Sequence, residues 1–139
     1  MENRFRGPIV SVQFPSFSNI TDLQLGHLRG LTKLQTLHLR HTEISDAGLE
    51  HLKGLTALQR LDLSGTGVTD SGLLSVKGLG NLQRLNLART QITDSGLRHL
   101  RALSNLRELD LTETKMRPGA VRQLQAALPN CQILGSDDG

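Results

Sequence analysis

The sequence predicts an α/β solenoid, a stack of similar units with parallel strands on one side and short helices on the other. Its 139 residues repeat with a period of 24, most completely in residues 82–103, and periods between about 20 and 50 residues are typical of stacked repeats. Each unit offers about seven apolar side chains, worth on the order of 10–20 kcal/mol when buried. Ordering a unit costs roughly 1–2 kcal/mol per residue in backbone entropy, so a unit is stable only when it stacks on its neighbours.

Three leucine columns mark the expected strand of each unit. They are Leu34, Leu58, Leu82 and Leu106, then Leu37, Leu61, Leu85 and Leu109, then Leu39, Leu63, Leu87 and Leu111. A threonine column follows each strand and comprises Thr42, Thr66, Thr90 and Thr114. Because a threonine hydroxyl can bond to the backbone where the chain leaves a strand, we expect this column to be structural.

The N-terminal segment, residues 1–17, is interpreted as a cap with a degenerate first strand. Val12 and Phe14 fall in the leucine columns if one residue is inserted before residue 20, which predicts an edge strand. We expect Phe5 and Phe17 to cover the open end of the leucine core, since the terminal repeats of a solenoid must shield that core from water.

Residues 18–134 are interpreted as the repeat domain. A Ser or Thr followed by Asp, such as Ser45-Asp46, precedes each short helix, and we expect these side chains to accept hydrogen bonds from free N–H groups at the helix start. Glycines just after the helices predict left-handed residues that end them; these are Gly30, Gly54 and Gly78. A second glycine column predicts a close approach between backbones; it comprises Gly48, Gly72 and Gly96.

The C-terminal end of the repeat domain is predicted to be a capping helix and a last strand. Pro118 stands at a favoured first-turn position, which predicts a helix over residues 118–128. Ile133 then returns to the leucine pattern in a short final strand. The polar tail, residues 135–139, is expected to be disordered.

A known family carries the same pattern. The units read Leu-x-x-Leu-x-Leu-x-x-Thr, followed in residues 92–100 by Ile-Thr-Asp-x-Gly-Leu-x-x-Leu. Residues 9–134 resemble the leucine-rich repeat family, and the second half of each unit resembles the cysteine-containing subclass of F-box substrate receptors and bacterial repeat proteins, with Thr in place of Cys. The resemblance implies a right-handed horseshoe segment with parallel strands on its concave face and helices on its convex face. It does not identify a ligand.

Composition narrows the function classes. Cys131 is the only cysteine, so an internal disulfide is excluded, and we expect a reducing compartment, the cytoplasm. The sequence contains no apolar run long enough for a signal peptide or a transmembrane helix, so we expect a soluble monomer without a membrane partner. The net charge of +3 is spread evenly, and the chain has no Tyr or Trp on which bases could stack; we expect no nucleic-acid partner.

The non-leucine residues of the strands and of the turns after them are the candidate partner-binding residues. They are Thr36, His38, Arg40, His41, Arg60, Asp62, Ser64, Arg84, Asn86, Arg89, Glu108, Asp110 and Glu113. Neighbouring strands lie about 4.8 Å apart, so equivalent residues of successive units should lie side by side. Their charge runs from basic to acidic along the chain, which indicates a surface for a protein or peptide of mixed charge. The alternative is a face that is merely solvated and salt-bridged.

One set of these residues has the composition of a hydrolytic triad, namely His38, Asp62 and Ser64. The sequence shows neither a strained nucleophile turn nor an oxyanion-hole loop beside them. Because open sheets bring such residues together by chance, we predict no catalytic site.

The helical side of the units carries two further clusters. One histidine column comprises His27, His51 and His99, but helices one repeat apart do not let three ligands converge on one ion, so we predict no metal site. A small basic patch comprises Arg98, Arg101 and Arg122. The glycines follow the repeat period and form no phosphate-binding loop, so we predict no cofactor.

We therefore predict a non-enzymatic protein interaction module that binds a protein or peptide through the concave strand face. Residues fixed on a strand ladder lose little further entropy on binding. Two alternatives remain open. One is a structural or accessory domain of a larger protein. The other is a substrate-receptor arm that resembles F-box leucine-rich repeat proteins, against which the missing F-box segment counts.

Overall fold

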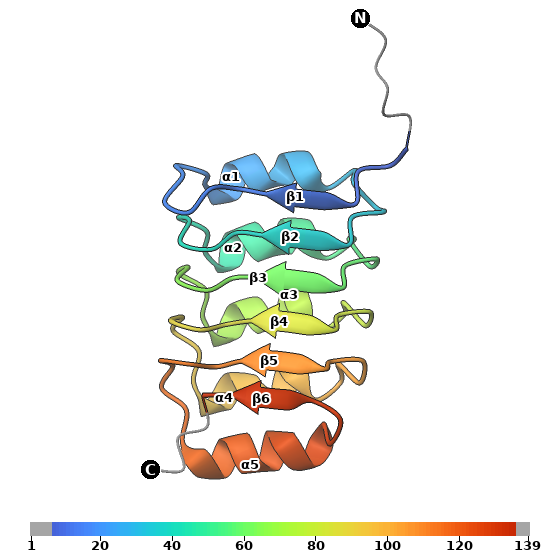
Figure 1. Cartoon of the computed structure of the whole chain (residues 1–139). Coiled ribbons are helices and arrows are strands. Elements are labelled where there is room, and N and C mark those ends of the chain that lie inside the picture. The colour runs from blue at the N-terminus through green and yellow to red at the C-terminus, as the bar shows by residue number, and fades with distance from the viewer. Residues whose placement is uncertain (1–6, 136–139) are drawn as a thin grey trace, which may run out of the picture.

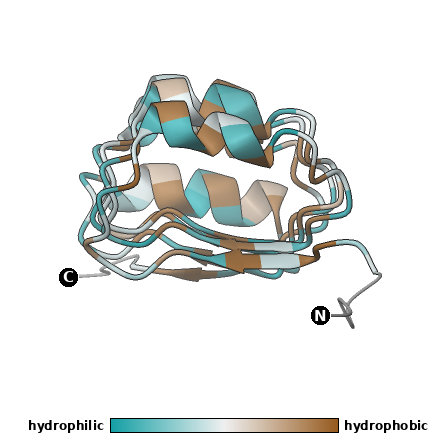
Figure 2. Cartoon of the chain, turned by 90° about the horizontal axis from the view of Figure 1, so that it is seen from above, coloured by the Kyte–Doolittle hydropathy of each residue, from teal (hydrophilic) through white to brown (hydrophobic). Residues whose placement is uncertain are grey.

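The computed structural model describes residues 7–135, which form a parallel sheet covered on one side by helices (Figures 1 and 2). Within this range the sheet has six strands, hydrogen-bonded in sequence order. They are β1 (Ser11–Gln13), β2 (Thr36–His38), β3 (Arg60–Asp62), β4 (Arg84–Asn86), β5 (Glu108–Asp110) and β6 (Gln132–Leu134). The α/β leucine-rich repeat solenoid predicted from the periodicity is confirmed.

Each of the first five strands is followed by a short helical segment that returns the chain to the next strand. The first four consist of an α-helical turn and a 3-10 turn: α1 (Asp22–Leu25) with η1 (Gly26–Leu28), α2 (Asp46–Leu49) with η2 (Glu50–Leu52), η3 (Asp70–Gly72) with α3 (Leu73–Val76), and α4 (Asp94–Leu97) with η4 (Arg98–Leu100). The last is the longer helix α5 (Pro118–Ala127), with Pro118 in its first turn. It lies at the end of the stack beside β6 (Figure 1).

The register places equivalent leucines side by side in a single core between sheet and helices. Leu37, Leu61, Leu85 and Leu109 pair across β2 to β5, with Val12 and Ile133 at the two ends. The four central leucines are at most 2% exposed. Because every unit contributes the same side chains, the core is continuous along the stack, and the opposite face of the sheet stays open.

The threonine column has the structural role expected from the sequence. Each Oγ1 donates a 2.6 Å hydrogen bond to the carbonyl oxygen three residues earlier, at the end of the strand. Thr42, Thr66 and Thr90 are buried. The hydroxyl therefore satisfies a buried carbonyl at the point where the chain turns away from the sheet.

The expectation for Phe17 was wrong. Its side chain is 79% exposed, and its ring stacks on the imidazole of His41 with the centroids 4.9 Å apart. Phe14, which is partly buried, packs against the N-terminal end of the core instead. Phe5 lies outside the described residues.

The aspartates at the helix starts join neighbouring repeats, which corrects the expected capping role. From α2 to α5, no N-cap side chain forms a hydrogen bond to its own helix. Instead, Asp46 Oδ1 accepts from the Thr69 backbone N–H at 2.7 Å, and Oδ2 accepts from the Thr69 hydroxyl at 2.5 Å. Asp22 and Asp70 bind the next repeat in the same way. We call this contact the aspartate joint.

The glycine columns also differ from expectation. Gly30, Gly54 and Gly78 do not adopt a positive φ; within residues 7–135, only Gly65 and Gly135 do so among the glycines. The close approach expected at Gly48, Gly72 and Gly96 is present, but the group that approaches is a side chain. A Cβ at any of the three would lie 2.3–2.4 Å from an Oδ1 of the preceding aspartate joint. This column therefore makes room for the joint.

Candidate interaction surface

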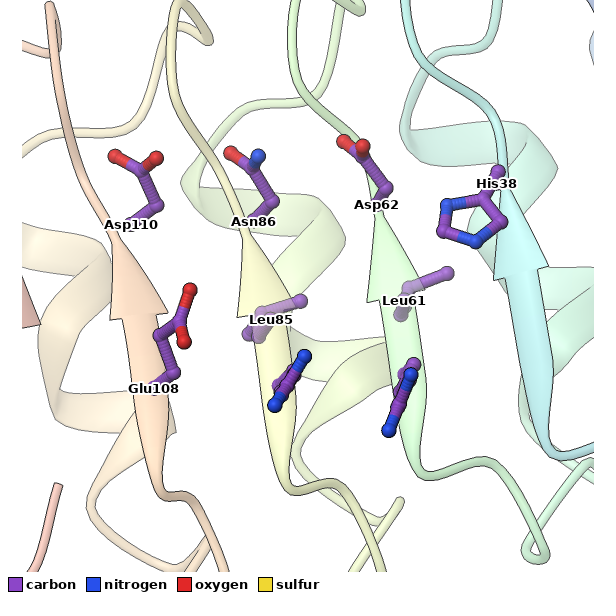
Figure 3. A pocket seen from close by; sticks show the side chains of 9 residues that line it. His38, Leu61, Asp62, Leu85, Asn86, Glu108 and Asp110 are labelled. Atoms are coloured by element: carbon purple, nitrogen blue, oxygen red, sulfur yellow. The ribbon is translucent and has the colours of Figure 1, made fainter. Parts of the chain in front are cut away.

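The open face of the sheet carries two rows of side chains across the strands, the arrangement predicted for the candidate site. The first row comprises Thr36, Arg60, Arg84 and Glu108, and the second comprises His38, Asp62, Asn86 and Asp110. Figure 3 shows both rows from the open side. Apart from Thr36, these residues line a shallow depression of about 170 Å³ together with Leu61 and Leu85.

Two arginines on adjacent strands of the first row form no ion pair within residues 7–135. Arg60 and Arg84 are exposed and pair in register on β3 and β4. Neither forms an ion pair with any residue of the described chain, and neither does Glu108, which stands in register with Arg84. The charge order along this row is therefore positive, positive, negative.

The second row is partly engaged by its own backbone. Asp62 Oδ1 accepts from the Ser64 N–H at 3.0 Å and from the Ser64 hydroxyl at 2.6 Å. Asn86 and Asp110 accept from the N–H two residues later in the same way. Figure 3 shows the Asp62, Asn86 and Asp110 side chains pointing toward the same end of their strands. This row therefore stabilises the turns after the strands.

Ser64 lies among the predicted partner-binding residues, but it is only 4% exposed. Its hydroxyl donates directly to Asp62, whereas a hydrolytic triad needs the histidine between the serine and the aspartate. His38, Asp62 and Ser64 therefore do not have the arrangement of a triad, and Ser64 offers a partner little surface.

A third row runs along the turns after the strands, and its residues share a left-handed backbone. Phe17, His41, Arg89 and Glu113 have φ between 53° and 64°, and Gly65 has φ of 68°. The N–H groups of Phe17, His41, Gly65 and Arg89 each donate to a carbonyl of the next repeat at 2.9 Å. Non-glycine residues rarely adopt this conformation, so the ladder of turns imposes it.

Side chains of the third row interact in pairs. His41 lies between the Phe17 ring and Gly65, where a Cβ would come within 2.1 Å of its Nδ1. Arg89 Nε donates to Glu113 Oε2 at 3.0 Å. Phe17 was missed as a surface residue because its hydrophobicity favoured a core position. Its spacing of 24 residues from His41 is the signal that would have placed it in this row.

The other predicted residues lie where the repeat pattern puts them. Arg40 is exposed and lines a second depression with His41. On the helical side, Arg29 Nε donates to His51 Nδ1 at 2.7 Å. No group of three His, Cys, Asp or Glu residues in the described chain is placed to hold a metal ion.

Cys131 is buried, and burial together with the Glu108 carboxylate raises the pKa of its thiol. No helix within residues 7–135 combines the length and apolar composition of a membrane span.

Solved structures with the same architecture include bacterial and actin-binding proteins. Internalin C2 of Listeria monocytogenes is 32% identical with a TM-score of 0.66, over 78% of this chain and 44% of its own. Another internalin of that organism (inlF) is 24% identical with a TM-score of 0.71, over 89% of this chain and 33% of its own. Leiomodin-1 actin-binding site 2 is 18% identical with a TM-score of 0.67, over 87% of this chain and 79% of its own. The last two likenesses show the fold alone.

The chain thus spans less than half the length of either internalin chain. No match was found among curated proteins. Two family models, both described as leucine-rich repeat, match residues 16–68 and residues 81–100. Together they cover more than half of the chain. The chain therefore belongs to the leucine-rich repeat family.

Proposed function

We propose that this chain is a non-enzymatic protein interaction module that binds a protein or peptide through the open face of its sheet. The observation that carries the proposal is the pair Arg60 and Arg84, two exposed guanidinium groups on adjacent strands without an ion pair in the described chain. Like charges placed side by side on a sheet are unfavourable for folding. A partner that supplies a carboxylate would remove this cost.

The rigidity of the scaffold supports the same proposal. The aspartate joints fix each repeat against the next, and the threonine bonds hold the turn that follows each strand. Side chains on such a ladder lose little further freedom when a partner binds, which favours affinity. The leucine-rich repeat fold is generally a protein interaction module, and one solved structure of this fold is actin-binding site 2 of leiomodin-1. A monomeric state, a cytoplasmic location and the lack of a nucleic-acid partner form part of the proposal.

A second candidate function is an accessory domain within a longer repeat protein. The observation in its favour is that the chain spans only 44% and 33% of the two internalin chains. In that case, the open face would be one part of a longer binding surface. The charge rows described above would still provide this part of the contact.

Affinity capture from a lysate of the source cells, with point variants, tests the proposal. The variant Arg84→Glu and its matched control Arg98→Glu, on the helical side, change the net charge equally and affect exposed residues. Arg84→Glu combined with Glu108→Arg restores the net charge but changes the order of the charges along the first row. Circular dichroism and thermal unfolding confirm that all variants are folded.

We expect a partner that binds the wild type and the Arg98→Glu variant and is lost with both open-face variants. Partners that bind all forms equally, or no partner with any form, would contradict binding through the open face. A partner lost only with Arg98→Glu would move the binding surface to the helices.

A further inference from the structure

The charge order of the first row specifies what kind of segment the open face can bind. Arg60, Arg84 and Glu108 stand on three successive strands in one row. Adjacent strands are about 4.8 Å apart. The row therefore presents two positive groups followed by one negative group, at even intervals along the solenoid axis.

The neighbouring carboxylates leave the arginine pair available. Asp62 and Asp110, in the second row, accept hydrogen bonds from the turns that follow them. Figure 3 shows these two side chains at the arrowhead ends of their strands, beyond the level of Glu108. Oδ1 of each carboxylate already has donors, and neither carboxylate forms an ion pair with Arg60 or Arg84 in the described chain. The two guanidinium groups can therefore donate to a carboxylate from outside. Arginine binds carboxylates through two parallel N–H···O bonds, which gives direction as well as strength.

The spacing of the row matches the spacing of an extended peptide. A carboxylate bound midway between Arg60 and Arg84 would lie one and a half strand spacings from Glu108, which is about 7 Å along the solenoid axis. Side chains two residues apart on an extended peptide lie on one face and are about 6.8 Å apart. A basic side chain two positions from the bound acid therefore reaches Glu108.

We propose that the open face recognises an extended segment of a protein partner that carries an acidic and a basic residue two positions apart. The segment runs along the solenoid axis, with its carboxylate between Arg60 and Arg84 and its cation against Glu108. This inference rests on the proposed function, since it names the chemistry of the partner. A polyanion such as a nucleic acid fits poorly, because Glu108 stands in the same row as the arginine pair and Asp110 lines the same depression.

NMR titration with a short peptide tests the inference, because it detects weak binding. The probe is Gly-Ser-Glu-Ser-Lys-Ser-Gly with blocked ends, added to the full chain labelled with nitrogen-15. The signals followed are the Nε–Hε groups of Arg60 and Arg84, assigned from Arg60→Lys and Arg84→Lys variants. Control peptides replace Glu by Gln, replace Lys by Gln, or place Glu and Lys next to each other. A further peptide carries phosphoserine in place of Glu.

We expect saturable shifts of both arginine signals with the probe and weaker binding of every Gln-substituted or adjacent-charge control. Arg60→Gln combined with Arg84→Gln should weaken binding about tenfold, from the loss of two exposed ion pairs. The Glu108→Gln variant should bind the Lys peptide and its Gln-substituted control equally well. It should still bind the probe more tightly than the peptide in which Gln replaces Glu. Arg98→Gln should change nothing.

Equal binding of the Glu-x-Lys probe and the adjacent-charge peptide would overturn the inference, as would no shift at either arginine. Tight binding of only the phosphoserine peptide would overturn the carboxylate ligand. If lysate capture depends on Arg84 while the peptides show no preference, the proposed function stands and this inference fails. If the probe binds as expected but capture is lost only with helical-side variants, the inference stands and the proposed partner surface fails.

Discussion

Substituting Gly72 by Ala tests whether the aspartate joint holds the repeats together. The φ of Gly72 is negative, in a helical turn, where Ala is normally more stable than Gly by about 1 kcal/mol. A Cβ at Gly72 would, however, lie 2.3 Å from Asp46 Oδ1 and 2.9 Å from Leu49 Cδ1. Asp46 would have to move, and it would lose its two hydrogen bonds from Thr69.

The size of the effect follows from these contacts. Hydrogen bonds to a charged group contribute about 1.5–3 kcal/mol each, and the lower value suits the half-buried Asp46. Losing two such bonds costs about 3 kcal/mol, against a helix-propensity gain of about 1 kcal/mol. We therefore expect Gly72→Ala to lower the free energy of unfolding by about 2 kcal/mol, measured by urea denaturation followed by circular dichroism.

A double-mutant cycle and a matched glycine provide the controls. In an Asp46→Ala background the clash with Oδ1 is gone and only the flexible end of Leu49, 2.9 Å from the added Cβ, must shift. Gly72→Ala should then be close to neutral, which gives a coupling energy of about 2 kcal/mol. Gly54 has no atom within 4 Å of an added Cβ, and Gly54→Ala should be neutral or slightly stabilising. The reasoning is refuted if Gly72→Ala is as stable as the wild type, or if its cost is the same with and without Asp46.

Three further predictions concern the turns, the cysteine and a surface ion pair. Gly65→Ala should cost about 1 kcal/mol in urea unfolding, because φ is 68° and the Cβ meets the His41 ring; equal stability would contradict this. Burial raises the pKa of the Cys131 thiol. Its contribution to the free energy of unfolding is therefore complete below the unfolded pKa of about 8.5 and should be lost as pH rises through the folded pKa. Cys131→Ser should make the free energy of unfolding less dependent on pH in this range. Glu113→Gln should change the free energy of unfolding by less than about 1 kcal/mol, since both partners of the Arg89–Glu113 pair are more than half exposed.

Periodicity alone is enough to predict the strands, the register and the threonine bonds. A leucine that recurs every 24 residues must occupy equivalent core positions, because no other arrangement buries all copies alike. The same reasoning places Arg60 beside Arg84 and Asp62 beside Asn86 from the repeat spacing. The sequence therefore predicts which residues share a row of the candidate surface, but not the hydrogen bonds and ion pairs that they form.

The failures have a common physical cause, since each concerns a polar or turn residue with two plausible local partners. Asp46 is compatible with capping its own helix, and only the packed structure shows that Thr69, 23 residues later, offers it two donors. Ser64 was expected on the surface because the strand pattern alternates, but it is only 4% exposed and its hydroxyl donates to Asp62. Phe17 was assigned to the core by hydrophobicity, whereas the left-handed turn directs it outward.

The exceptions in the glycine column support the aspartate joint and connect it to function. Gln24 occupies this column in the first repeat, and its Oε1 accepts the Thr21 N–H at 2.9 Å, the donor that a joint aspartate binds in later repeats. Ala120 occupies it in the last repeat, where Asp94 accepts the Arg117 N–H at 2.9 Å and pairs with the Arg117 guanidinium at 3.7 Å, because Arg117 has no hydroxyl to donate. Glycine is therefore found where a full joint forms. Since each joint fixes one repeat on the next, it also keeps the rows of the open face in register.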